Sequence, residues 1–202
     1  MKAKVMRLGS TATVMGNLRS SSSLTGKWPS DVMSIPEFYS AFVPEYKSQN
    51  YGPRIFVLEW NRGYARRIEG ISAKRSSSRV SSYLVSEEIV RVENKLAKKG
   101  EASIRFGNLK SGHGYSGERG DFCLVAGIVK KRELTVYYRS LELIGGFAFD
   151  LTLFWNLERE LLCDFRKITL VTNKAFIFAL KGNSNEKLYP KLCNIFSDRL
   201  RG

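Results

Sequence analysis

Hydrophobic and polar positions follow each other along this chain with two periods, which predict strands and helices in mixed order. Runs rich in β-branched and aromatic residues are typical of strands, and apolar residues three or four positions apart are typical of a helix with one buried face. The predicted strands are residues 54–60, 103–106, 122–129, 134–138, 168–171 and 175–180, and the predicted helices are residues 86–99, a segment that opens at Asp150, and residues 187–200.

The segments between these elements predict how they connect. The charged run 130–133 predicts a hairpin turn, and the run from Thr172 to Lys174 predicts the turn of a second hairpin. Residues 61–70 predict a turn into another extended piece, and Ser86 is a candidate helix N-cap. Together the elements predict an α+β fold with a mixed or antiparallel sheet packed with helices.

The composition is that of a chain with one substantial core. Hydrophobic residues make up 43% and aromatic residues 12% of the 202 residues, which is enough for one domain. Residues 28–202 are predicted to form this domain, and residues 1–27, rich in Ser, Thr, Gly and basic residues, are predicted to be an arm. Such an arm could lie along phosphates, or it could be a tail that needs no ligand.

Several residue types indicate the cellular compartment and the possible chemistry. Cys123, Cys163 and Cys193 have no paired spacing, which argues against a disulfide framework or a metal site and fits a reducing compartment. Apolar runs are too short for a bilayer span and no signal-peptide pattern opens the sequence, so we expect a cytoplasmic protein without a membrane partner. His113 lies in a glycine-rich loop, where it could act as an acid or base or have no catalytic role.

The net charge of +14 is the strongest compositional signal. The chain has 33 basic and 19 acidic residues, and residues 1–82 alone carry 13 basic and 5 acidic groups. A polyanion such as nucleic acid is therefore the natural partner, although a basic protein without such a partner would have the same composition. The adjacent Arg66 and Arg67 are candidates for phosphate contacts.

The stretch from Tyr137 to Leu151 concentrates the candidate chemistry. Arg139 and Ser140 follow a predicted strand, and two glycines precede Asp150. A guanidinium group forms a charged bidentate fork and a hydroxyl adds a donor beside it, so this pair suits a phosphate. The alternative is a structural arginine at a strand end.

The residues R-S-x-E-x-x-x-G-x-A-F-D at 139–150 resemble the R-S-x-D-x-x-x-G-x-P-F-N signature of thymidylate synthases. They are also similar to the relatives that hydroxymethylate deoxycytidylate, in which the final Asn is replaced by Asp. The resemblance implies that Arg139 and Ser140 hold the nucleotide 5′-phosphate and that Gly146 allows its close approach. It also implies that Asp150 recognises the pyrimidine edge, because a carboxylate accepts from the exocyclic amine of cytosine where an amide would serve a uracil.

The resemblance covers residues 121–162 and departs from the family at the nucleophile. The family has its cysteine in a P-C-H motif, whereas here Cys123 is displaced, and counting inward from the hairpin turn puts Asp121 nearest that position. A one-residue slip along a strand would turn the thiol to the other face. Downstream, Phe176 and Phe178 stand where the family has His and Tyr, and they lack the polar groups that hold the sugar hydroxyl.

Three functions remain open at this point. In the first, the chain binds a pyrimidine nucleotide and transfers a one-carbon unit from methylenetetrahydrofolate to C5 of a cytosine nucleotide, with Cys123 as the nucleophile. The resemblance then implies a homodimer, and Arg66, Arg67 or Arg105 could supply further phosphate contacts. In the second, a catalytically inactive protein of the same fold binds nucleic acid through its basic surface. In the third, the chain is a basic interaction protein of an unrelated α+β fold.

Overall fold

The computed structural model describes residues 32–42, 48–70, 83–106, 123–178 and 184–197. Because residues 1–27 lie outside these ranges, the division into an arm and one domain stays a prediction. The strands are β1 (Met33–Ser34), β2 (Gln49–Glu59), β3 (Glu101–Arg105), β4 (Leu124–Lys130), β5 (Glu133–Tyr138), β6 (Leu141–Glu142) and β7 (Lys167–Ile177). The helices are α2 (Ile35–Phe42), residues 62–70, α4 (Ser86–Lys99), α5 (Gly145–Glu160) and α6 (Ser184–Ser197).

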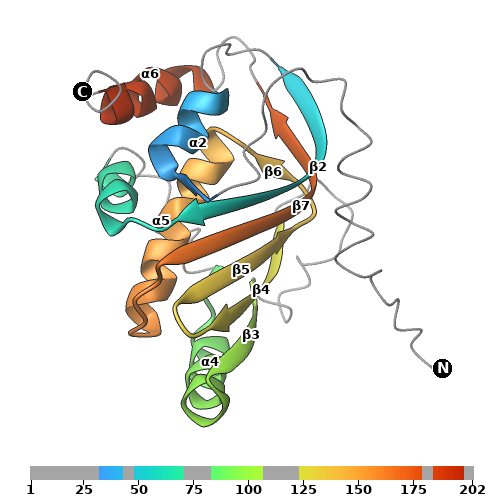
Figure 1. The fold of residues 1–202 in the computed structure, drawn as a ribbon, viewed down its shortest axis with the longest axis vertical. Coiled ribbons are helices and arrows are strands. Elements are labelled where there is room, and N and C mark those ends of the chain that lie inside the picture. The colour runs from blue at the N-terminus through green and yellow to red at the C-terminus, as the bar shows by residue number, and fades with distance from the viewer. Residues whose placement is uncertain (1–31, 43–47, 71–82, 107–122, 179–183, 198–202) are drawn as a thin grey trace, which may run out of the picture. The chain divides into compact units, whose positions relative to one another are not determined.

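The described strands form one mixed sheet in the order β1-β2-β7-β5-β4-β3, and β6 pairs with β7 after β5 has ended (Figure 1). β5 runs parallel to β7, whereas β2 is antiparallel to β7, and β3 and β5 are antiparallel to β4. Parallel neighbours need a crossover connection, and α5 supplies it between β5 and β7. The prediction of an α+β fold with a mixed sheet packed with helices is confirmed.

Aromatic side chains of α2 join the sheet to α5. The ring centroid of Phe38 lies 5.1 Å from that of Phe56 on β2 and 4.4 Å from that of Phe147 on α5. Tyr39 also contacts Phe147, and its hydroxyl donates to the carbonyl oxygen of Ile144 at 3.4 Å. Buried aromatic rings contribute large apolar contact areas. The cluster therefore fixes the first turns of α5, which carry Asp150.

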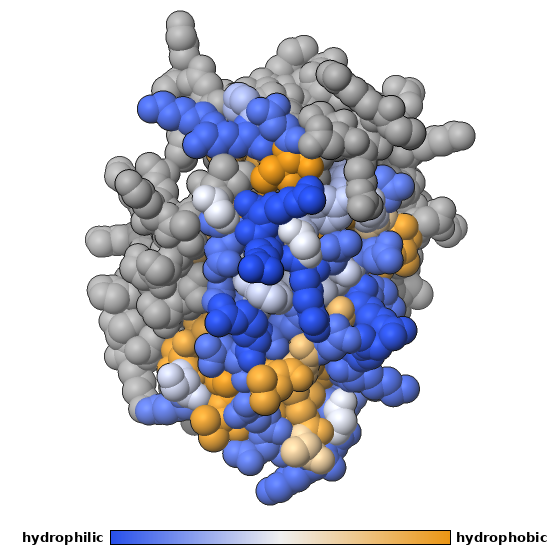
Figure 2. Space-filling view, turned by 90° about the vertical axis from the view of Figure 1, so that its left-hand side faces the viewer, coloured by the Kyte–Doolittle hydropathy of each residue, from blue (hydrophilic) through white to orange (hydrophobic). Residues whose placement is uncertain are grey.

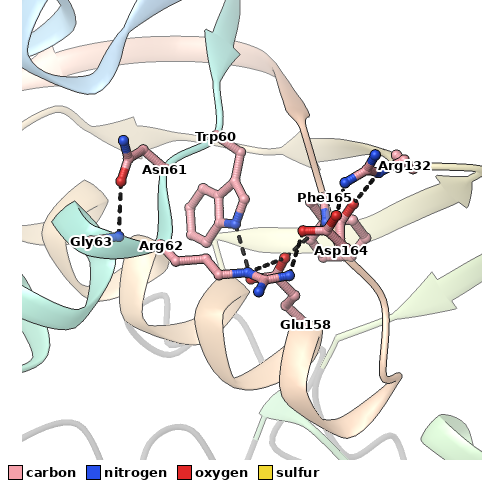
Figure 3. Close-up of polar contacts among 8 residues, drawn as sticks. All are labelled: Trp60, Asn61, Arg62, Gly63, Arg132, Glu158, Asp164 and Phe165. Atoms are coloured by element: carbon pink, nitrogen blue, oxygen red, sulfur yellow. Dashed lines mark hydrogen bonds and ion pairs between the residues drawn. The ribbon is translucent and has the colours of Figure 1, made fainter.

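A buried carboxylate joins the other end of α5 to the sheet (Figure 3). Glu158 is 2% exposed and accepts hydrogen bonds from Trp60 Nε1 at 3.0 Å and from the backbone N–H of Phe165 at 2.8 Å. Arg62 Nε donates to the same carboxylate at 3.2 Å and its terminal nitrogen pairs with Asp164. Since Trp60 follows β2 and Phe165 precedes β7, this network lies where β2 ends and β7 begins.

Two predictions of local structure are wrong. The run from Thr172 to Lys174 is no hairpin turn, because β7 is continuous and pairs with β2 on one edge and with β5 and β6 on the other. The register with β2 shifts there, and Thr172 Oγ1 donates to the Lys174 carbonyl at 2.9 Å, as in a bulge. Residues 62–70 form a helix instead of an extended piece. Asn61 caps this helix, since its Oδ1 accepts from the N–H of Gly63 at 2.9 Å.

Two helix starts also differ from the sequence prediction. Ser86 is the first residue of α4 and Val85 is its N-cap, without a side-chain cap. The end of α4 follows the prediction, because Gly100 has φ of 69° and its N–H donates to the carbonyl of Leu96. α5 begins at Gly145, before Asp150, because an acidic side chain upstream binds its first N–H groups.

No helix among the described residues is long and apolar enough to cross a bilayer. Figure 2 shows the side of the molecule that lies on the left in Figure 1, and its visible described part is mainly hydrophilic. The hydrophobic side chains on it form separate clusters. Scattered apolar residues of this kind are normal on a protein surface.

Candidate functional site

A bulge in β4 sets the geometry of the candidate site. Ala126 pairs with Tyr137, but Leu124 pairs with Tyr138, so Val125 is an extra residue in β4. Leu124 is consequently buried, at 1% exposure, whereas Val125 is 47% exposed. Counting residues from the hairpin turn as if β4 were regular therefore gives the residues before Val125 the wrong partners on β5. It also assigns their side chains to the wrong face of the sheet.

Beyond the bulge, Cys123 lies opposite Arg139. The N–H of Arg139 donates to the carbonyl oxygen of Cys123 at 2.8 Å. Ser140 Oγ donates to Cys123 Sγ at 3.0 Å. The structure therefore brings the half-buried thiol to the arginine and serine of the motif, which the sequence count did not anticipate.

Asp150 lies on the buried side of α5 and is 7% exposed. Burial raises its pKa from 3.8 to about 8, the charge of Glu142 raises it as well, and an interaction with the Tyr138 hydroxyl lowers it. The carboxyl is therefore protonated at neutral pH. A protonated carboxyl offers both a donor and an acceptor, so it can pair with cytosine or with uracil. The sequence argument took Asp150 as a carboxylate that only accepts, and its role in base recognition stays a prediction.

Tyr138 is a candidate residue that the sequence did not single out. It is 4% exposed, and its hydroxyl oxygen is buried without a partner that satisfies hydrogen-bond geometry among the described residues. Burial raises the pKa of this hydroxyl well above 10, and the charges of Asp150, Tyr83 and Cys123 raise it further. The hydroxyl thus lies within electrostatic reach of both the thiol and the buried acid. Strand alternation predicts an inward Tyr138, but no sequence signal predicts an unbonded hydroxyl.

Glu142 anchors the N-terminus of α5. Its carboxylate accepts hydrogen bonds from the N–H groups of Gly146 at 2.8 Å and Ile144 at 3.2 Å. Burial raises the pKa of Glu142, and these backbone donors lower it. A Cβ on Gly146 would lie 3.0 Å from Glu142 Cβ, so in the described structure glycine makes room for this internal cap. A phosphate contact at Gly146 stays a prediction.

The predicted phosphate-binding arginines lie at different ends of the sheet. Arg139 is exposed beside Cys123, and Arg105 pairs with Ala126 at the same end of the strands. The Arg105 side chain is 60% exposed, with its Nε 3.8 Å from a Glu88 oxygen. Arg66 and Arg67 are exposed on residues 62–70, which follow the opposite end of β2. Within one chain, Arg105 therefore lies nearer to Cys123 than Arg66 and Arg67 do.

The remaining candidates add little polarity to the site. Phe176 is half-buried, with Lys174 Nζ 5.4 Å from its ring centroid, and Phe178 is 45% exposed. His113 and Asp121 lie outside the described residues. Within the described ranges, no group of three or more His, Cys, Asp and Glu side chains could hold a metal ion.

Asp150→Asn is expected to change how stability depends on pH. A carboxyl with a raised folded-state pKa binds its proton more tightly in the folded chain, so its contribution to stability is present below pH 4 and is lost as the pH rises through about 8. Relative to the variant, the wild-type free energy of unfolding should therefore fall by about 4 kcal/mol between roughly pH 5 and pH 8.5, at about 1.4 kcal/mol per pH unit. Urea titrations at both pH values measure this difference. Glu160→Gln, an exposed change on the same helix, is the control, and a pH-independent difference for Asp150→Asn would contradict the assignment.

Comparisons with known proteins give a likeness to solved structures. No family model matches the sequence, and no curated protein matches it. Among solved structures, the thymidylate synthase of T4 phage is similar over 78% of this chain and 78% of that chain, with a TM-score of 0.42 and 8% sequence identity. A likeness of this size carries no argument about the site, so the functional argument rests on the motif and on the geometry around Cys123.

Proposed function

We propose that this chain binds a pyrimidine nucleotide and activates C5 of the base, in the manner of thymidylate synthases and deoxycytidylate hydroxymethylases. The observation that carries the proposal is the 3.0 Å hydrogen bond from Ser140 to the sulfur of Cys123, which joins a thiol to the motif. Arg139 and Ser140 would hold the 5′-phosphate. Asp150 would recognise the polar edge of the base.

The proposed chemistry begins with the sulfur of Cys123. Its thiolate adds to C6 of the pyrimidine, and the electron pair of the C5–C6 double bond moves to C5, which takes a proton from solvent. In the reverse step, C5 loses either of its two hydrogens and the sulfur leaves C6. The net result is exchange of the C5 hydrogen with water, and it needs no oxidant or reductant.

Transfer of a one-carbon unit would also require methylenetetrahydrofolate, which the resemblance implies. Glu142, the acid of the motif, binds the N–H groups of Gly146 and Ile144 and is buried within the fold. This acid is therefore an internal cap of α5. The proposed step is limited to activation of C5, and the folate is treated as a co-substrate to be tested.

The test is release of tritium from C5 of labelled dCMP and dUMP by the full chain. We expect release from at least one of the two nucleotides. Release without methylenetetrahydrofolate would identify simple exchange, and release only in its presence would identify one-carbon transfer. If neither nucleotide releases tritium under either condition, the chain does not activate C5 and the proposal is wrong.

A second candidate is nucleic-acid binding by a catalytically inactive protein. The net charge of +14 and the exposed side chains of Arg66, Arg67, Arg105 and Arg139 favour it. Binding that neutralises phosphates weakens steeply as salt rises. Affinity for single-stranded DNA and RNA across a salt series therefore tests it: steep salt dependence without tritium release would select this function, and no binding at low salt would remove it.

The proposal includes the homodimer that the resemblance implies. Val125 and Ile128 are 47% and 40% exposed on the sheet face that points away from the buried core. We propose that a second copy covers this face, because burying such residues is favourable. A monomeric mass in light scattering across a concentration series would remove this part of the proposal.

A further inference from the structure

The buried hydroxyl of Tyr138 is a polar group that the folded chain leaves unexplained. Its ring occupies an inner position of β5, paired with Leu124 on one side and Thr172 on the other. The hydroxyl interacts with the Asp150 carboxyl, but no described residue meets hydrogen-bond geometry with it. An unsatisfied buried polar group costs about 1–3 kcal/mol, so native proteins keep few of them without a reason.

Three observations place this hydroxyl in the candidate site. Tyr138 directly precedes Arg139, which pairs with Cys123 through its backbone. Asp150 and Cys123 both act electrostatically on the Tyr138 hydroxyl. Tyr138 is therefore a donor that lies near both the proposed nucleophile and the proposed base-recognition residue, and a ligand could supply the hydrogen bond that the chain does not.

We propose that the Tyr138 hydroxyl donates a hydrogen bond to the pyrimidine base beside Asp150 and so is a substrate contact. This inference rests on the proposed function and extends it to a residue outside the R-S-x-E motif. The polar edge of a pyrimidine has three adjacent positions, O2, N3 and the substituent at C4. A protonated carboxyl can pair with N3 and the C4 substituent, and a hydroxyl donor then matches O2. Since cytosine and uracil share O2, this contact serves either base.

Tyr138→Phe tests the proposal because it removes only the hydroxyl. We expect the dissociation constants for dCMP and dUMP, measured by calorimetry at neutral pH, to rise about tenfold each, which corresponds to one lost hydrogen bond. The urea midpoint of the variant without nucleotide should stay close to that of the wild type, because the interaction of this hydroxyl with Asp150 does not satisfy hydrogen-bond geometry. Tyr137→Phe is the matched control, because this neighbour is half-buried on the opposite face of β5, and it should leave both affinities unchanged.

The possible results separate this inference from the proposed function. If the wild type binds a nucleotide and Tyr138→Phe binds it equally well, the hydroxyl is no substrate contact while the proposed function stands. If Tyr138→Phe lowers the urea midpoint but not the affinity, the hydroxyl has a structural partner and the inference is wrong. If the wild type binds neither dCMP nor dUMP, the proposed function and this inference both fail.

Discussion

Cys123→Ala should reduce tritium release from C5 of dCMP or dUMP by at least about 1,000-fold, because loss of a nucleophile removes the covalent step itself. Nucleotide binding should weaken by less than about tenfold, since the loss of one neutral contact is worth little more than 1 kcal/mol. Arg139, Ser140 and Asp150 remain in place in this variant. A large effect on rate with a small effect on affinity is what distinguishes a nucleophile from a binding residue.

Cys163→Ala is the matched control for this experiment. Cys163 is also a half-buried thiol, but it follows α5 near Glu158 and Glu93, where burial and these charges raise its pKa. A thiol that holds its proton is a poor nucleophile. Cys163→Ala should therefore exchange C5 tritium at the wild-type rate. Wild-type exchange by Cys123→Ala, or its loss in Cys163→Ala alone, would show that the nucleophile is assigned wrongly.

Elements governed by local signals were predictable from the sequence. Residues 134–138 alternate between apolar and polar positions, and they form β5 because one face of this strand is buried. α4 ends before Gly100 because a left-handed residue can close a helix there, and glycine adopts that conformation without strain. The sequence also predicted a mixed sheet, since strands and helices follow one another without a regular βαβ repeat.

The position of Cys123 was not predictable in the same way. An extra residue at Val125 has no signature in the hydrophobic pattern, because it depends on how β4 and β5 pair. A one-residue bulge changes the partner of every residue that precedes it in the strand. On a regular hairpin Cys123 would be displaced from the family position, whereas the structure brings Cys123 to Arg139 and Ser140.

The raised pKa of Asp150 was also not predictable from the sequence. Its pKa follows from burial, which requires α5 to pack against the sheet, and from Glu142, which turns inward to cap α5. A sequence shows that an acid is present but not how much water surrounds it. The preference for cytosine is argued from an ionised Asp150, whereas the raised pKa favours a protonated carboxyl that suits either base, so the choice of base stays a prediction.

Glu158→Ala should lower the free energy of unfolding by about 3–5 kcal/mol, which is a large part of the stability of a typical domain. The change leaves Trp60 Nε1 and the Phe165 N–H buried without their acceptor, and it removes one of two anionic partners of Arg62 (Figure 3). Arg132 still pairs with Asp164, so part of the network persists. Urea titration followed by far-ultraviolet circular dichroism measures the loss.

Glu158→Gln separates hydrogen bonding from charge in the same network. The amide keeps an acceptor for Trp60 or Phe165 but loses the ion pair with Arg62, so we expect a smaller loss of about 1–2 kcal/mol. Glu160→Ala, an exposed change on the same helix, should stay within about 0.5 kcal/mol of the wild type. If Glu158→Ala is no less stable than Glu160→Ala, the buried carboxylate does not hold α5 to the sheet. Since this network joins the ends of β2 and α5 away from Cys123, the loss should appear in stability and leave the nucleotide affinity of the folded protein unchanged.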